Sequence, residues 1–139
     1  MKRTIVLSLL LLSFFSCKKE DNITLHEYLS GGWQLVKIGA DINNNQMLEE
    51  NELVPLPDSL IALNFYSNGT GNGGFLFGDT SASAPFAWTT NDRQETLTMT
   101  ALTGTYELHI KALNYSSFYV INDNLKVLGG KLGMVFKRR

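Results

Sequence analysis

The sequence has few of the residues on which metal centres, disulfide frameworks and charged interfaces depend. One cysteine and two histidines stand among 139 residues, which excludes a disulfide framework, a cysteine-rich zinc site and an iron–sulfur cluster. Charged residues make up only 18% of the chain, and the formal net charge is −1. Because there is no basic surplus to neutralise phosphates, we expect no nucleic-acid binding.

Long apolar runs are also missing. The run from Ile5 to Phe15 covers about eleven residues, which is short of the roughly 20 that a membrane-spanning helix needs. Lys2 and Arg3 precede it, and a basic start followed by a short apolar run is typical of a secretory signal peptide. The remainder of the chain is long enough for one domain, and its aromatic content favours a compact β-rich one.

The apolar run ends at Phe14-Phe15-Ser16-Cys17, which contains the only cysteine of the chain. A small residue directly before the cysteine resembles the lipobox of bacterial lipoproteins, with Phe14 in place of the usual leucine. Relaxed lipoboxes of this kind occur in lipoproteins of Bacteroidetes-type bacteria. The resemblance implies a lipoprotein signal peptide over residues 1–16 and a diacylglycerol anchor, with palmitate chains, on Cys17. An uncleaved or conventionally cleaved signal peptide with an unmodified Cys17 is the alternative.

Residues 17–22 then form a lipidated tether between the membrane and the domain. Several acyl chains on one residue hold a protein firmly to a bilayer, because each buried CH₂ contributes about 0.8 kcal/mol. Lys18 follows the cysteine, and nothing in the tether indicates retention in the inner membrane. We therefore expect a protein anchored to the outer membrane, on its periplasmic or cell-surface face.

Residues 23–139 predict one all-β domain behind a short helix. The helix is expected within Asn22–Ser30, because Thr24 and Glu27 have the spacing of a capping box. After it, short runs alternate between apolar and polar residues and are separated by turn residues such as Asn122-Asp123-Asn124. The expected strands are Gly32–Ile38, Leu60–Tyr66, Gly73–Phe77, Pro85–Thr90, Thr96–Leu102, Thr105–Ala112, Ser117–Ile121 and Leu132–Lys137. Eight short strands in sequence favour an up-and-down antiparallel β-barrel, with a β-sandwich as the alternative.

Several motifs carry a family resemblance. The segment Leu29-Ser30-Gly31-Gly32-Trp33-Gln34-Leu35 is similar to the Gly-x-Trp strand that opens lipocalin-type barrels. Phe86-Ala87-Trp88 and the closing Met134-Val135-Phe136-Lys137 follow in the same order as in those barrels. From Leu29 to Lys137 the chain resembles the small lipocalin-like domain of many Bacteroidetes lipoproteins. The resemblance implies a fold and an envelope location, and Trp33 as a core residue that closes the barrel.

The strand pattern is compatible with either a packed barrel interior or an interior that contains a pocket. One face of the strands carries eighteen mostly large apolar side chains, and these can fill an eight-stranded barrel completely or leave room for one small ligand. If a pocket exists, we expect it at the end away from Trp33 and the helix. Its expected lining is Phe75, Phe77, Phe86 and Trp88.

Oxygen-bearing residues in Asp41–Glu52 follow the spacing of an EF-hand calcium loop. The expected ligands are Asp41, Asn43, Asn45, Glu49 and Glu52, with the carbonyl of Met47. Gln46 occupies the position where such loops have glycine, because the backbone there adopts a positive φ, and a side chain at that position costs about 1 kcal/mol. The alternatives are a weak structural calcium site and a solvated acidic loop.

These features favour binding over catalysis. His26 and His109 lie more than eighty residues apart, and no nucleophile has a base at a recognisable spacing, so we expect no enzymatic activity. The sequence instead predicts a lipid-anchored envelope protein that binds a small apolar ligand. The alternative is a structural or interaction subunit of an outer-membrane complex, with an envelope protein as its partner and no small-molecule ligand.

Overall fold

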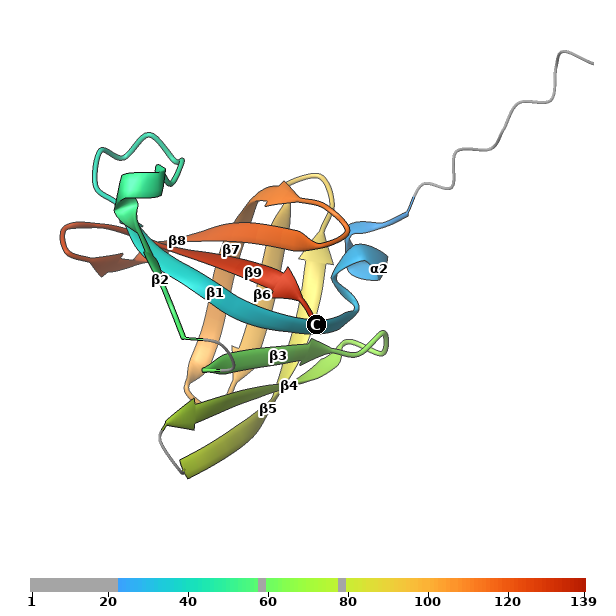
Figure 1. Ribbon diagram of the computed structural model, residues 1–139. Helices are drawn as coiled ribbons and strands as arrows, with labels where there is room; N and C mark the ends of the chain where they lie inside the picture. Colours follow the sequence, from blue (N-terminus) through green and yellow to red (C-terminus); the bar gives the residue numbers. More distant parts are fainter. Residues whose placement is uncertain (1–22, 58–59, 78–79) are drawn as a thin grey trace, which may run out of the picture.

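The computed structural model describes residues 23–57, 60–77 and 80–139, which form a closed antiparallel barrel (Figure 1). Helix α2 (Leu25–Leu29) precedes it. The barrel strands are β1 (Gly31–Asp41), β3 (Ile61–Phe65), β4 (Thr70–Phe77), β5 (Thr80–Asn91), β6 (Thr96–Ala101), β7 (Gly104–Leu113), β8 (Ser117–Val127) and β9 (Gly130–Arg138). Each pairs with the next, and β9 pairs back with β1. The predicted eight-stranded up-and-down barrel is confirmed, and the sandwich alternative is excluded.

Helix α2 begins at the predicted capping box. The Thr24 hydroxyl accepts the Glu27 N–H at 3.2 Å, and the Glu27 carboxylate accepts the Thr24 N–H at 2.8 Å. The bonds that the Thr24 N–H and the Thr24 hydroxyl donate to the Glu27 carboxylate stabilise its ionised form and lower the pKa of Glu27. Leu29 is fully buried in the barrel core, so the helix covers one end of the barrel (Figure 1). We call this the closed end and the opposite end the open end.

The structure contains one strand that the sequence pattern did not predict. Strand β2 (Leu53–Pro55) follows a short 3-10 helix, η2 (Glu50–Glu52), and pairs with Lys37–Gly39 of β1. It lies outside the closed cycle of eight strands. A strand of three residues, the last of them a proline, is too short to show an alternating pattern, which explains why this strand was missed.

The predicted break at Asn122-Asp123-Asn124 is wrong, because β8 continues to Val127. The pairing register of β8 with β9 shifts between Asn122 and Lys126, so the polar residues form an irregularity within the strand. The turn to β9 comes later, at Leu128 and Gly129, whose φ angles are +53° and +89°. Asparagine and aspartate are common in both turns and bulges, and their presence alone did not distinguish the two.

The aromatic core lies at the closed end. Trp33, Phe65, Trp88 and Phe118 are all less than 2% exposed. The ring of Trp33 meets Phe118 edge-on with centroids 4.7 Å apart, and Phe65 meets Trp88 in the same way at 5.0 Å. The predicted role of Trp33 as a core residue at this end agrees with its complete burial. Among the residues described, no helix is long and apolar enough to cross a membrane.

Candidate functional site

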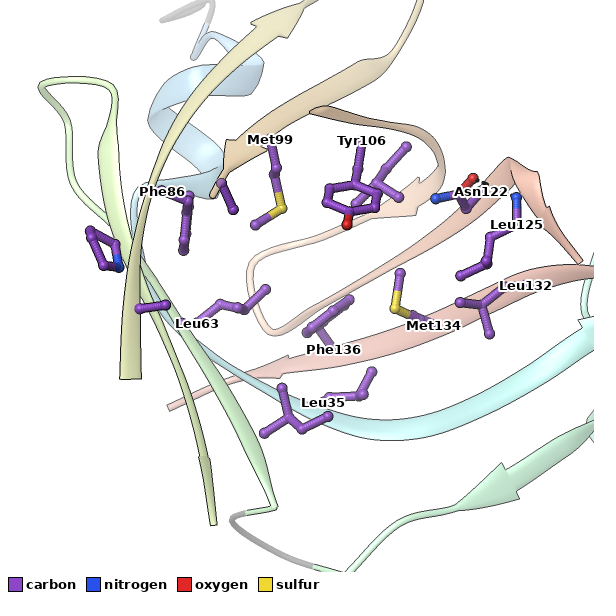
Figure 2. A pocket seen from close by; sticks show the side chains of 16 residues that line it. Leu35, Leu63, Phe86, Met99, Tyr106, Asn122, Leu125, Leu132, Met134 and Phe136 are labelled. Carbon is purple, nitrogen blue, oxygen red and sulfur yellow. Dashed lines mark hydrogen bonds between the residues drawn. The ribbon is translucent and has the colours of Figure 1, made fainter. Parts of the chain in front are cut away.

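A cavity of about 350 Å³ occupies the half of the barrel that lies toward the open end (Figure 2). Every strand of the closed barrel contributes to its wall. The lining residues are Leu35, Ile61, Leu63, Gly73, Ala84, Pro85, Phe86, Met99, Ala101, Tyr106, Leu108, Asn122, Leu125, Leu132, Met134 and Phe136. A volume of this size lies within the range of small-molecule pockets, about 300–1,000 Å³.

The wall of this cavity is almost entirely apolar. None of the described lining residues carries a charge, and only Tyr106 and Asn122 have polar side chains. The Tyr106 hydroxyl donates a hydrogen bond to the hydroxyl of Thr103 at 3.0 Å, so this residue presents mainly its ring to the cavity. The site therefore suits an apolar molecule and offers one polar side chain, Asn122, to orient it.

Asn122 lies in the middle of β8 and is 4% exposed. Its Oδ1 accepts the backbone N–H groups of Asn124 at 2.9 Å and Leu125 at 3.0 Å. Because both donors approach the oxygen, the amide orientation is fixed and the nitrogen faces the other way. Figure 2 shows that nitrogen on the side toward Tyr106. Among the described residues, none accepts a hydrogen bond from it.

Several apolar side chains are exposed on the strands and turns at the open end of the barrel. Leu102, in the β6–β7 turn, is 95% exposed, and Leu125 and Tyr106 are 47% and 40% exposed. Phe75, near the end of β4, is 51% exposed. Exposed apolar residues at the same end as an apolar cavity are typical of a ligand entrance or of a contact surface.

The four residues predicted to line the pocket lie in different places. Phe86 lines the cavity. Trp88 lies at the closed end instead, where its indole N–H donates to the carbonyls of Tyr66 and Thr70. Phe75 is not among the lining residues, and the side chain of Phe77 lies outside the described part of the structure. Their contact with a ligand stays a prediction.

Sequence analysis missed Asn122 as a lining residue. It appeared there only as part of an expected turn, whereas the period-two alternation of Phe118 and Val120 continues to it. Asn122 pairs with the lining residue Leu132, and paired residues point to the same face of a sheet. Extending the alternation by two residues would have placed Asn122 inside the barrel.

The predicted calcium residues form a compact loop after β1. Asp41 is 1% exposed, and its two carboxylate oxygens accept the N–H groups of Asn45 at 3.1 Å and Gln46 at 2.9 Å. Glu52 accepts the N–H groups of Ile42 and Glu49. As the spacing predicted, Gln46 has a positive φ of 62°.

The other predicted ligands of this loop are engaged with one another. The side-chain amide of Asn43 donates to Glu49 at 3.2 Å, and Asn45 accepts the N–H of Met47 at 2.8 Å. No cluster of three or more His, Cys, Asp or Glu side chains in the described ranges has metal-binding geometry. Calcium binding by this loop stays a prediction that a calcium titration can test.

Cys17, the predicted lipidation site, lies outside the described residues.

A charged cluster occupies the outer face of β7, β8 and β9. Asp123 contacts Lys131 at 2.8 Å and His109 Nε2 at 3.1 Å. The hydrogen bond from Lys131 lowers the pKa of Asp123. Partial burial raises this pKa, but the positive charges of Lys131, His109 and Lys111 lower it further, so the net shift is downward. This face is the outer one, and the cluster does not contribute to the described cavity wall.

Two residues at the closed end have roles that sequence analysis did not assign. Arg138 lies over the Trp33 ring at 4.2 Å and donates to the carbonyls of Tyr28, Ser30 and Tyr115. The imidazole of His26 stacks on Trp88 with centroids 4.1 Å apart. Both contacts fasten α2 to the barrel, and neither residue lies in a motif that indicates such a role.

The architecture is that of a lipocalin-type barrel, a closed antiparallel sheet with one covered end and an apolar interior. No protein-family model and no curated protein matches the sequence. A crystal structure of a lipocalin-like protein from Bacteroides uniformis superposes with a TM-score of 0.58 at 14% identity, over 81% of this chain and 99% of that chain. The chain therefore has a lipocalin-like fold.

Bovine odorant-binding protein also appears among the similar structures. Its complex with a selenium-containing odorant has a TM-score of 0.44 and 20% identity, over 88% of this chain and 77% of that chain. A deswapped triple mutant of the same protein has a TM-score of 0.40 and 20% identity, over 81% of this chain and 74% of that chain.

Proposed function

We propose that this protein is a lipid-anchored binding protein of the cell envelope that holds a small apolar molecule in the barrel cavity. The cavity itself carries the proposal, because it has a volume of about 350 Å³ and a nearly unbroken apolar wall. Packed protein interiors leave few voids larger than a water molecule. A larger apolar void that reaches an apolar mouth is the usual form of a small-ligand site.

Binding, rather than catalysis, is the activity that we propose for this site. Catalysis requires a nucleophile, an acid or base, or a metal beside the substrate. The two polar side chains of the described cavity wall, Tyr106 and Asn122, supply hydrogen bonds only. His109 belongs to the outer cluster, and His26 stacks on Trp88 at the closed end.

Filling the cavity tests this proposal. Ala101 lines the cavity, and the neighbouring Thr100 is exposed on the outer face of the same strand. We expect Ala101→Trp to occupy the cavity and to weaken binding of N-phenylnaphthylamine, an uncharged apolar fluorophore, at least tenfold. Thr100→Trp adds the same side chain outside the barrel, and binding should stay at the wild-type level. Equal binding by all three proteins would place the probe outside the cavity and contradict the proposal.

The proposed anchor is the Cys17 thiol at the outer membrane. The basic start, the short apolar run and the single cysteine directly after Ser16 support it. Growing the native host with radiolabelled palmitate tests this part separately. Label should enter the wild-type protein and be lost from Cys17→Ala, and an unlabelled wild-type protein would contradict the anchor without affecting the cavity proposal.

A second candidate function is that of an interaction subunit in an outer-membrane complex. The exposed apolar rim of Phe75, Leu102 and Leu125 favours it, since clustered exposed apolar residues also mark protein contacts. Crosslinking in native cells distinguishes the two functions. If a protein crosslinks to the rim and Leu102→Lys abolishes that crosslink while probe binding persists, the rim serves a partner in addition to the cavity.

A further inference from the structure

We infer that the cavity selects an uncharged apolar molecule with one carbonyl oxygen, which accepts a hydrogen bond from Asn122 Nδ2. This inference rests on the proposed function and specifies the chemistry of its ligand. It depends on three observations, namely a side-chain donor that faces the cavity, the absence of charge on the described wall, and the position of the donor relative to the apolar surface opposite it.

The hydrogen-bond donor is the side-chain amide of Asn122. Asn122 has a fixed orientation, because its oxygen accepts two backbone N–H groups at 2.9 and 3.0 Å. Its NH₂ group is left on the side of the cavity that faces Tyr106 (Figure 2). None of the described residues accepts a hydrogen bond from this group, and it is accessible from the cavity that Asn122 lines. An acceptor atom on a ligand in the cavity can therefore form a hydrogen bond with it, and that bond is shielded from water once the ligand is bound.

The apolar wall then restricts the charge of the ligand. The described lining residues include no lysine, arginine or histidine. Lys131, which precedes the lining residue Leu132, is bound to Asp123 at 2.8 Å on the outer face. An ionised carboxylate in the cavity would lose its hydration without gaining a counter-charge, which is strongly unfavourable. A neutral carbonyl costs far less to desolvate than a charged group, and the donor that Asn122 provides offsets that cost.

The position of the donor suggests how the ligand lies. Figure 2 shows Asn122 and Leu125 at one side of the cavity, and Leu63 and Phe86 at the opposite side. A carbonyl near one end of a ligand therefore contacts Asn122 while its hydrocarbon part extends toward Leu63 and Phe86. The volume of about 350 Å³ lies at the small end of ligand pockets, which fits a medium-chain ketone or ester better than a bulky lipid.

A pair of matched ligands tests this inference. We would measure calorimetrically the affinity of the purified protein for a medium-chain methyl ketone and for the alkane of equal length. The ratio of the two affinities is then compared between wild type and Asn122→Asp at pH 8. The aspartate keeps the oxygen that accepts the two N–H groups but replaces the donor with a second acceptor. Met99→Leu, another lining substitution, is the control.

We expect Asn122→Asp to lower the ketone-to-alkane affinity ratio about tenfold, the effect of losing one buried hydrogen bond. Met99→Leu should change both affinities by the same factor and leave the ratio at its wild-type value. If Asn122→Asp also leaves the ratio unchanged, the role of Asn122 is wrong and the cavity proposal stands. If the wild type binds neither ligand, the proposed function itself fails.

A direct signal from Asn122 covers the case in which the aspartate variant does not fold. In the wild-type protein, the side-chain NH₂ resonances of Asn122 can be followed by ¹H–¹⁵N NMR. A downfield shift of one amide proton with the ketone, absent with the alkane, supports the hydrogen bond. A saturating ketone that leaves these resonances where the alkane leaves them overturns it.

Discussion

The two ends of this barrel are made from the same eight strands and have opposite interiors. At the closed end, four aromatic rings and Leu29 are almost fully buried, and α2 is fastened over them by Arg138 and His26. At the open end, the side chains of the same strands surround a cavity of about 350 Å³, and several are half exposed. The barrel therefore concentrates its packing at one end and leaves space at the other.

This difference separates stability from binding. A close-packed aromatic cluster contributes most of the free energy that burial can supply. Binding sites are commonly drawn from the less stable parts of a fold, where packing is incomplete. Substitutions at the closed end should therefore change the free energy of unfolding, and substitutions at the open end should mainly change ligand affinity.

Removing Trp33 should have the largest effect on stability. Its side chain is 0% exposed, its ring contacts Phe118, and its N–H donates to the Leu29 carbonyl at 2.7 Å. Trp33→Ala should lower the free energy of unfolding by about 3–5 kcal/mol. Urea denaturation followed by circular dichroism measures this change.

Met99→Ala is the matched truncation at the open end, because Met99 already borders the cavity. We expect a loss of about 1 kcal/mol, since few atoms pack against the removed side chain on that side. Equal losses in the two variants would show that the ends do not differ in their contribution to stability.

Substitution of Arg138 should have the second-largest effect on the free energy of unfolding. Arg138→Gln removes the cation over the Trp33 ring and the donors to the carbonyls of Tyr28 and Ser30. We expect a loss of about 2–3 kcal/mol from the hydrogen bonds and the cation–π contact together. Arg138→Lys keeps the charge without the planar guanidinium and should recover only part of that stability. Thermal unfolding of the three proteins provides the comparison, and a full recovery by lysine would show that charge alone matters.

Sequence analysis predicted most of the closed end and less of the open end. The capping box at Thr24, the buried Trp33 and the alternating strands depend on local patterns, and each pattern leaves a signature in a few neighbouring residues. The contacts of Arg138 join residues more than a hundred positions apart. No local pattern carries such information.

The cavity was harder to predict because it depends on how much space side chains leave unfilled. The sequence placed eighteen apolar residues on one face and left a full core and a pocket both open. Whether the core is full or contains a pocket depends on strand tilt and on the positions of small residues in the wall, such as Gly73 and Ala84. Asn122 was missed for a different reason, since a polar residue inside an otherwise apolar strand looks like the start of a turn.

The β8–β9 turn at the open end should allow a modest gain in stability. Leu128 is 87% exposed and has a φ of +53°, a conformation that is unfavourable for leucine and common for asparagine. It precedes Gly129 at +89°, and Asn-Gly is the preferred pair for turns in which both residues have positive φ. Leu128→Asn should raise the free energy of unfolding by about 1 kcal/mol without changing affinity for N-phenylnaphthylamine. An unchanged or lower melting temperature would contradict this account of the turn.

The outer cluster around Asp123 should have the smallest effect, and that effect should depend on pH. Lys131 lowers the pKa of Asp123 below its ordinary value of 3.8, so the folded state favours the ionised carboxylate. The resulting stability is fully present above the unfolded-state pKa and is lost as the pH falls through the lower pKa of the folded state. Because the Asp123 side chain is 40% exposed, solvent screening limits the contribution to about 0.5 kcal/mol.

Asp123→Asn should therefore be slightly less stable than wild type at pH 7, and the difference should disappear in acid below the folded-state pKa of Asp123. High salt at pH 7 should also reduce the difference, since surface charges are screened. The measurement is the urea midpoint of both proteins across this pH range. A difference that persists in acid would show that Asp123 acts through packing or through the backbone irregularity of β8. This part of the open end would then contribute to stability through packing, as the closed end does, despite the exposure of its side chains.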